Sequence, residues 1–229
     1  MSRPAIFFLT IITPFLALLL AWLGLVTLRT NPLGGFLLIV GIIYSAGVVY
    51  LYWIRRNQSW ASGAGGAVVG EERGDHSFWL IALGMASAFY ASPVEYGFFP
   101  ALLPRAVWAK AFGVVLVISG FALFIWARRA MKAFYSGHIN VTEAQPLVQS
   151  GPYRLIRHPA YAGFLLMALG IVLGYSSLVG LAAVLLLLLP GLAWRIRVEE
   201  SLLEAHFGPQ WQAYCDRVPA MLPRFKMRG

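Results

Sequence analysis

The chain has 229 residues, of which 59% are hydrophobic and only 12% are charged. So little charge cannot cover the surface of a soluble globule of this length, so the composition excludes that class and predicts a membrane protein. The net charge of +9 does not indicate nucleic-acid binding, because the basic residues punctuate apolar runs and have no base-stacking platform of their own. With Cys215 as the single cysteine, neither an intramolecular disulfide nor a cysteine metal cluster can form.

Apolar runs long enough to cross a bilayer recur along the chain, since a hydrocarbon core about 30 Å thick needs roughly 20 helical residues. The predicted spans are Ala5–Leu28, Leu33–Ile54, Phe78–Phe99, Val107–Trp126, Ala160–Tyr175 and Leu178–Trp194. The first is too long for the core of a cleaved signal peptide and predicts a retained helix. The third contains Ser92-Pro93 and Glu95, so five spans remain an alternative. The last two are short, and the turn Gly174–Ser177 between them predicts a helical hairpin. The expected fold class is an all-α, polytopic membrane protein.

The basic residues predict the orientation in the membrane. With six spans, three basic residues fall on one side, at Arg29, Arg105 and Lys110, and the other fifteen of the 18 fall on the opposite side. Because basic residues favour the cytoplasmic side, both termini are expected there. The glycine-rich stretch Ser59–Gly66 lies in a loop on that side. It lacks the Lys-Ser/Thr ending of a phosphate-binding loop, so it is predicted to be a linker.

Polar residues concentrate in two cytoplasmic segments, His138–Arg157 and Arg195–Asp216, which flank the predicted hairpin. The hairpin brings His158 close to Glu199, so one site can hold both segments. We therefore divide the chain into N-terminal transmembrane helices (1–127, about four) and a catalytic core (128–229). Purely structural interpretations stay open: His158 as a helix cap, the neighbouring arginines as interfacial anchors, and Arg195 with Glu199 as an ordinary pair one helical turn apart. The four histidines do not have metal-ligand spacing, so no metal site is expected.

These two segments resemble the integral membrane isoprenylcysteine carboxyl methyltransferases and the related phospholipid N-methyltransferases over roughly residues 134–225. The first carries Leu147-Val148, Ser150-Gly151-Pro152-Tyr153 and Arg157-His158-Pro159 with Tyr161 and Gly163. After the hairpin follow Arg195, Glu199-Glu200, Leu203, Phe207-Gly208, Trp211, Tyr214, Arg217-Val218-Pro219 and Pro223. The order and spacing of both sets agree with the family.

The resemblance implies S-adenosylmethionine as the methyl donor, enclosed between the two segments. The implied donor-binding residues are His138, Gln145, Leu147, Val148, Tyr153, His158, Pro159, Tyr161, Glu199 and Glu200. Arg195 matches the arginine that faces the methyl acceptor, and Arg157 is assigned with it as a catalytic residue. Carboxylates suit a cationic donor and an arginine suits an anionic acceptor. The expected acceptor is a lipophilic or lipidated molecule reached from the bilayer, with membrane lipids as the surrounding partner.

Other functions remain possible from the sequence. A sterol or steroid reductase of the related membrane superfamily shares the Gly-Pro-Tyr and Arg-His-Pro-x-Tyr pattern, and Trp211, Tyr214 and Cys215 echo its ending. A phospholipid N-methyltransferase and a scaffold that anchors lipid headgroups are further alternatives. The N-terminal spans show no match, so the sequence leaves open whether the acceptor is a carboxylate, an amine or a thiol.

Overall fold

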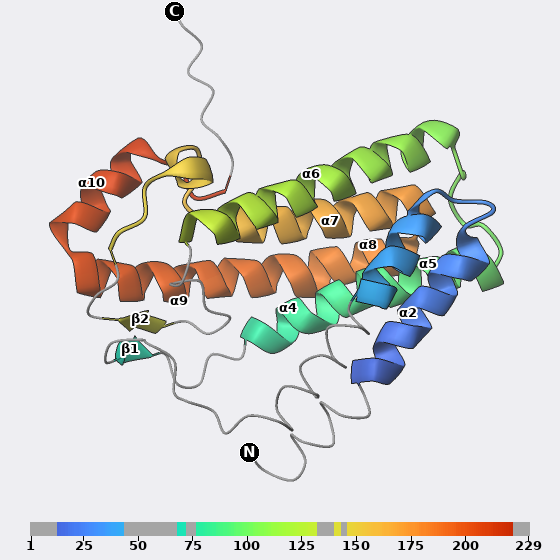
Figure 1. Ribbon diagram of the computed structural model, residues 1–229, viewed down its shortest axis with the longest axis horizontal. Helices are drawn as coiled ribbons and strands as arrows, with labels where there is room; N and C mark the ends of the chain where they lie inside the picture. Colours follow the sequence, from blue (N-terminus) through green and yellow to red (C-terminus); the bar gives the residue numbers. More distant parts are fainter. Residues whose placement is uncertain (1–12, 44–67, 72–76, 132–139, 143–145, 222–229) are drawn as a thin grey trace, which may run out of the picture. The chain divides into compact units, whose positions relative to one another are not determined.

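The structure is a computed structural model that describes residues 13–43, 68–71, 77–131, 140–142 and 146–221. Its elements are helices joined by short turns, with one pair of short strands (Figure 1). In chain order they are α2 (Thr13–Thr27), a helix at Leu33–Ile43, β1 (Val68–Glu71), α4 (Ser77–Ala86), η2 (Ser87–Ala91), α5 (Ser92–Phe98), α6 (Val107–Met131), β2 (Asn140–Thr142), η4 (Gly151–Arg154), α7 (Pro159–Tyr175), α8 (Leu178–Ala183), η5 (Val184–Leu188), α9 (Leu189–Phe207) and α10 (Pro209–Arg217).

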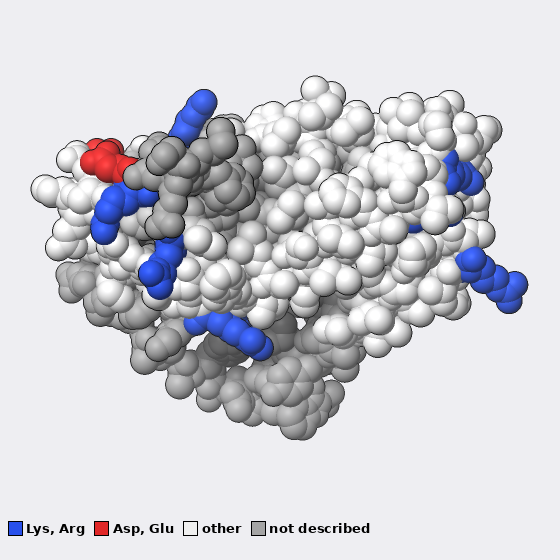
Figure 2. Space-filling model, turned by 90° about the horizontal axis from the view of Figure 1, so that it is seen from above, with Lys and Arg blue, Asp and Glu red and all other residues white. Residues whose placement is uncertain are grey.

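The predicted helical membrane fold is confirmed. Three continuous helices are long and apolar enough to cross a bilayer, Ser77–Phe98, Val107–Met131 and Leu178–Phe207. Three shorter apolar helices accompany them, Phe15–Thr27, Leu33–Ile43 and Pro159–Tyr175. The outer parts of the first two predicted spans lie outside the described residues, so the number of six spans stays a prediction. Figure 2 shows a broad uncharged area on the described surface, with the few charged side chains at its margins. Large apolar side chains of the long helices, such as Ile118 and Leu186, are exposed, as expected of helices that face lipid.

Prolines explain the irregular turns within two of the long helices. A proline inside a helix lacks the N–H that would bond to the carbonyl four residues earlier. In the third predicted span, the π-helical turn η2 directly precedes α5 with Pro93 in its first turn. The same arrangement recurs at η5 and Pro190 in α9. Ser92-Pro93 therefore deforms the predicted span without ending it.

The helix of the sixth predicted span continues beyond its apolar part. The sequence analysis ended the apolar span at Trp194 and set Arg195 and Glu199 one helical turn apart, and the helix that starts at Leu178 runs through both to Phe207. Charged side chains do not terminate a helix when they can reach solvent or partners. The helix ends instead at Gly208, whose φ of +50° is a conformation that glycine adopts without steric cost, and Pro209 follows it. Arg195, Glu199 and Glu200 thus stand on one regular helix.

The chain packs as two compact units, each assembled from separate segments. The first comprises residues 1–63, 86–114 and 170–181. Inside it, the Thr27 and Tyr175 hydroxyls lie 2.9 Å apart and the Asn31 amide donates to the Gly174 carbonyl at 2.7 Å. The carboxylate of Glu95 accepts hydrogen bonds from the Ser177 hydroxyl at 2.6 Å and from two backbone N–H groups at the start of α8. The N-terminus of α8 therefore stabilises the carboxylate of Glu95 within this apolar span.

The second unit comprises residues 64–85, 115–169 and 182–229. Its helices approach closely at glycines, where a side chain would not fit. A Cβ at Gly120 on α6 would lie 2.7 Å from the Gly163 carbonyl oxygen on α7, and one at Gly84 on α4 would lie 2.7 Å from the Leu188 backbone nitrogen. Close packing through small residues is typical of membrane helices.

A short antiparallel ribbon adds to this second unit an element that the sequence analysis did not predict. Val68 of β1 pairs with Thr142 of β2, and Glu71 pairs with Asn140. The first strand belongs to the loop that follows the predicted linker, and the second lies between His138 and Gln145 in the predicted donor-binding segment. The loop that joins the second and third predicted spans therefore pairs with the segment expected to hold the donor.

Candidate active site

The predicted site residues that the structure describes meet in the second unit, where the start of α7 faces α9. Pro159 begins α7, as its missing N–H predicts, and the His158 carbonyl accepts the first helical hydrogen bond, from the Ala162 N–H at 3.1 Å. His158 thus occupies the N-cap position through its backbone. Its side chain makes other contacts, described next, so capping does not account for the imidazole.

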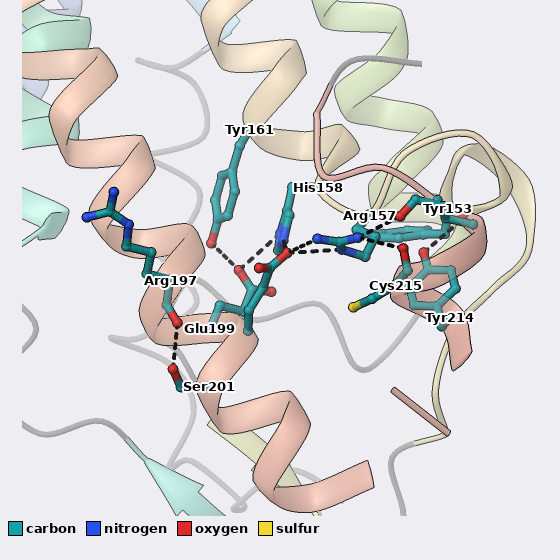
Figure 3. Close-up of polar contacts among 11 residues, drawn as sticks. Tyr153, Arg157, His158, Tyr161, Arg197, Glu199, Ser201, Tyr214 and Cys215 are labelled. Atoms are coloured by element: carbon teal, nitrogen blue, oxygen red, sulfur yellow. Dashed lines mark hydrogen bonds and ion pairs between the residues drawn. The ribbon is translucent and has the colours of Figure 1, made fainter. Parts of the chain in front are cut away.

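The His158 ring lies between two carboxylates (Figure 3). His158 is 4% exposed. Its Nε2 lies 3.0 Å from Glu200 Oε1 and its Nδ1 lies 3.7 Å from Glu199 Oε2. An ionised carboxylate only accepts hydrogen bonds, so Nε2 is the donor in the contact with Glu200. The hairpin prediction that placed His158 beside Glu199 is borne out by these distances.

Tyr161 joins the acidic side of the site to the basic side. Its hydroxyl donates to Glu199 Oε2 at 2.7 Å and accepts a hydrogen bond from Arg195 Nε at 3.1 Å. Arg195 and Glu199 lie one turn apart on α9, as predicted, and the hydroxyl of Tyr161 from α7 connects them. The Tyr161 ring also stacks on His158, with centroids 5.7 Å apart. Arg195 is 8% exposed whereas the Glu199 side chain is 32% exposed. Of the two residues joined through Tyr161, Glu199 is therefore the more accessible to solvent.

The acid pair consists of Glu199 and Glu200, and Arg157 is bound by the second of them. Its Nε and Nη2 donate to Glu200 Oε1 at 3.0 and 2.7 Å. Together with His158, it gives this one oxygen three hydrogen bonds. Charge-assisted bonds of this kind fix the carboxylate more firmly than neutral ones. Protein groups therefore hold Glu200 through Oε1, whereas among the described residues Glu199 accepts a single hydrogen bond, from Tyr161.

The remaining predicted donor-binding residues fall into two groups. His138 and Gln145 lie outside the described residues. Leu147 packs against the buried cluster of Trp211, Tyr214 and Val218, and Val148 beside it is half-buried. Tyr153 is buried, and its carbonyl accepts a hydrogen bond from the Tyr214 hydroxyl at 2.7 Å. Burial raises the pKa of Tyr214 to about 12, so this hydroxyl remains a donor throughout the physiological pH range.

The contribution of the C-terminal helix α10 was not assigned by the sequence analysis. Trp211, Tyr214 and Val218 line one face of this segment and pack under the η4 turn, and Figure 1 shows α10 folding back from the end of α9. Burial also raises the pKa of the neighbouring Cys215 thiol, so this cysteine is not an activated nucleophile. The spacing of three and four between large apolar residues after the acid pair is the signal that could have indicated a packing face.

The described part of the site offers no arrangement for a metal. Within residues 13–43, 68–71, 77–131, 140–142 and 146–221, no group of three or more His, Cys, Asp or Glu side chains could hold a metal ion. What the arrangement provides instead is a half-exposed carboxylate and a buried guanidinium, linked through one hydroxyl. Such a pair can bind a cationic and an anionic group next to each other.

Comparison with known proteins assigns the family. A family model described as phospholipid methyltransferase matches residues 108–210. The chain is similar to protein-S-isoprenylcysteine O-methyltransferase B of Arabidopsis thaliana, with 32% identity over 165 residues, which make up 69% of this chain and 82% of that protein. Protein-S-isoprenylcysteine O-methyltransferase A of the same plant is 32% identical over 146 residues, covering 62% of this chain and 73% of the relative.

A solved structure supports the fold. The chain resembles the eukaryotic intramembrane Ras methyltransferase, an isoprenylcysteine carboxyl methyltransferase, with a TM-score of 0.58 and 24% identity over 91% of this chain and 74% of that one. The resemblance noted in the sequence is thereby confirmed, and neither the reductase nor the scaffold alternative is favoured. The chain is an integral membrane methyltransferase and belongs to the isoprenylcysteine carboxyl methyltransferase family.

Proposed function

We propose that this methyltransferase transfers a methyl group from S-adenosylmethionine to the carboxylate of an isoprenylated cysteine. The observation that carries this proposal is the chain of contacts from Glu199 through the Tyr161 hydroxyl to Arg195. It sets a carboxylate and a guanidinium side by side in one site. A cationic donor and an anionic acceptor would each meet the opposite charge there, and their reacting groups would be held next to each other.

The residues of the site fit the proposed donor. When bound, S-adenosylmethionine supplies a methyl group on a positively charged sulfonium, and its α-amino group carries a second positive charge. Glu199 Oε2 is held by Tyr161, and among the described residues its Oε1 has no hydrogen-bond partner, so this oxygen is available to a cation. Glu200 would act through the orientation of His158. The proposed donor-binding set is His138, Gln145, Leu147, Val148, Tyr153, His158, Pro159, Tyr161, Glu199 and Glu200.

Arg195 would bind the acceptor. A carboxylate is already deprotonated near pH 7, so its methylation requires no general base. The guanidinium would hold the carboxylate in line with the donor, and the isoprenyl chain would lie among apolar side chains that face the bilayer. An amine acceptor would gain nothing from a buried arginine and would also need proton removal. The charge of Arg195 therefore favours an acid over an aminophospholipid.

The acceptor is tested by comparing methylation of an N-acylated S-farnesylcysteine with that of N-acetylcysteine and an aminophospholipid. We expect the farnesylated acid to give a kcat/KM at least about a hundredfold above that of N-acetylcysteine, because burial of the isoprenyl chain contributes to its binding. Its methyl ester is the matched control and should accept no methyl group. Equal methylation of the water-soluble acid would rule out a site for the isoprenyl chain, and preference for the aminophospholipid would point to N-methylation.

We further propose that both termini and the donor site face the cytoplasm, because fifteen of the 18 basic residues fall on that side of the predicted spans. The test uses a Cys215→Ala background and a membrane-impermeant thiol reagent added to intact cells. Ala101→Cys, at an exposed position between α5 and α6, should be labelled, whereas Gln212→Cys, at an exposed position of α10, should not. The opposite pattern would invert the topology.

A further inference from the structure

The backbone that follows α10 is bound by Arg157 and His158. Arg157 Nη1 donates to the Val218 carbonyl at 2.6 Å and to the Cys215 carbonyl at 3.3 Å. The backbone N–H of Arg157 donates to the Pro219 carbonyl and that of His158 to the Ala220 carbonyl, both at 2.9 Å. Two residues of the family motif thus make four hydrogen bonds to one short stretch of chain. The match to the family model ends at residue 210, so this stretch lies beyond it.

Arg157 connects this stretch to the acid pair. While Nη1 contacts the carbonyls, Nε and Nη2 hold Glu200 Oε1. The guanidinium carbon also lies 5.8 Å from the centroid of the Trp211 ring. A guanidinium has five N–H groups in a fixed planar fork, so binding on one edge determines where the other edge points. Arg157 is also only 12% exposed along its side chain, and its position is set by groups of the protein.

A second contact from the same helix reaches the other side of the site. The buried Tyr214 hydroxyl donates to the Tyr153 carbonyl, and Leu147 packs against the buried cluster to which Tyr214 belongs. Both Tyr153 and Leu147 belong to the proposed donor-binding set. The C-terminal segment therefore contacts the donor site at two places, the η4 turn and the Arg157-His158 backbone and guanidinium.

We propose that residues 211–220, here called the C-terminal clamp, position the donor site, and that Arg157 is a positioning residue that acts through Glu200 and His158. This inference rests on the proposed function, because it concerns the same donor site. It changes the role expected for Arg157 from the sequence: the arginine orients the donor-binding acid pair and does not contact the acceptor. Of the two arginines Arg157 and Arg195, only Arg195 then faces the acceptor.

The experiment uses the full-length chain purified in detergent, with S-adenosylhomocysteine as the probe of donor binding in calorimetric titrations. The variants are Arg157→Lys, which keeps the charge but loses the planar fork, Tyr214→Phe, which removes one hydroxyl, and the double variant. Arg154→Lys is the matched control, since Arg154 is exposed and precedes Arg157 by three residues. Acceptor KM and kcat are measured at saturating donor, and thermal stability is measured without ligand.

We expect Arg157→Lys to raise the Kd for S-adenosylhomocysteine about ten- to hundredfold, the range given by loss of hydrogen bonds to a charged group. Tyr214→Phe should raise it about three- to tenfold, and the double variant should fall short of the product of the two because both act on one site. At saturating donor, the acceptor KM should rise less than the donor Kd in each variant, because the affected contacts lie on the donor side of the site. Arg154→Lys should bind the probe as the wild type does.

An unchanged Kd in Arg157→Lys, or an acceptor KM that rises more than the donor Kd, would overturn the positioning role. If Arg157→Lys does not fold, Tyr214→Phe decides alone, and an unchanged Kd in that variant overturns the clamp. Absence of binding to the wild-type chain is a different result. It would remove the proposed function, and this inference with it.

Discussion

Replacement of Arg195 by alanine is expected to lower kcat about 10²- to 10³-fold, the range typical of removing one preorganised group that stabilises charge during reaction. The guanidinium is buried and bound to the Tyr161 hydroxyl, so its orientation is set before the acceptor arrives. The affinity for S-adenosylhomocysteine should fall only about three- to tenfold, because Tyr161 loses one hydrogen bond and keeps the one to Glu199. Single-turnover kinetics and calorimetric titration measure the two quantities separately.

Arg197→Ala is the control for this result. Arg197 lies two residues further along α9 and is exposed, and in Figure 3 its side chain points away from the acid pair. It should retain wild-type kcat and donor affinity. Equal losses of activity in the two variants would mean that the basic charge of α9, and not a specific contact of Arg195, supports turnover.

Glu199→Gln is expected to raise the Kd for S-adenosylhomocysteine about ten- to hundredfold, because it removes a charge that meets a cationic ligand. Glutamine keeps an oxygen that can accept the hydrogen bond of Tyr161, so the contacts among α7 and α9 should survive. The melting temperature without ligand should therefore be close to that of wild type. The measurement is again calorimetric titration, paired with thermal unfolding of the apo protein.

Glu204→Gln provides the matched comparison on the same helix. Glu204 is exposed and accepts a hydrogen bond from the Gln212 amide at 3.1 Å, away from His158 and Tyr161. It should leave donor affinity unchanged. If Glu199→Gln instead lowers apo stability sharply while donor affinity holds, Glu199 is a structural partner of Tyr161 and Arg195, and the proposed donor site is wrong.

Local sequence features predicted some parts of this fold within a residue or two. Pro159 at the start of α7 and the turn after Tyr175 followed from proline and turn chemistry, which act on the backbone directly. The sequence analysis placed the end of the last apolar span at Trp194 and the next charged residues on a helix, but it did not place the end of that helix, which lies at Phe207. Only the backbone signal at Gly208 and Pro209 marks the true end.

In the candidate site, too, the sequence predicted some contacts and not others. The hairpin logic brought His158 and Glu199 together correctly, since a short turn leaves few other arrangements. The hydroxyl bridge of Tyr161 depends on which faces of α7 and α9 meet, and spacing along one helix carries no such information. The contacts of Arg157 with the backbone after α10 were beyond sequence reasoning for another reason: every residue has a carbonyl oxygen, so a backbone acceptor leaves no signature in the side chains.

The continuous helix Leu178–Phe207 also links the two ends of the proposed site. Arg195 and Glu199 are four residues apart, which is about 6 Å along a helix axis, and they continue the helix whose preceding residues are apolar. A thinner or thicker bilayer changes the tilt of such a helix and does not bend it between these two residues. If Arg195 binds the acceptor headgroup and Glu199 the donor, as proposed, the levels at which the two molecules bind shift together. A change in lipid composition would alter how well an acceptor headgroup at a given depth in the bilayer reaches Arg195. The distance between the bound donor and the bound acceptor would stay constant.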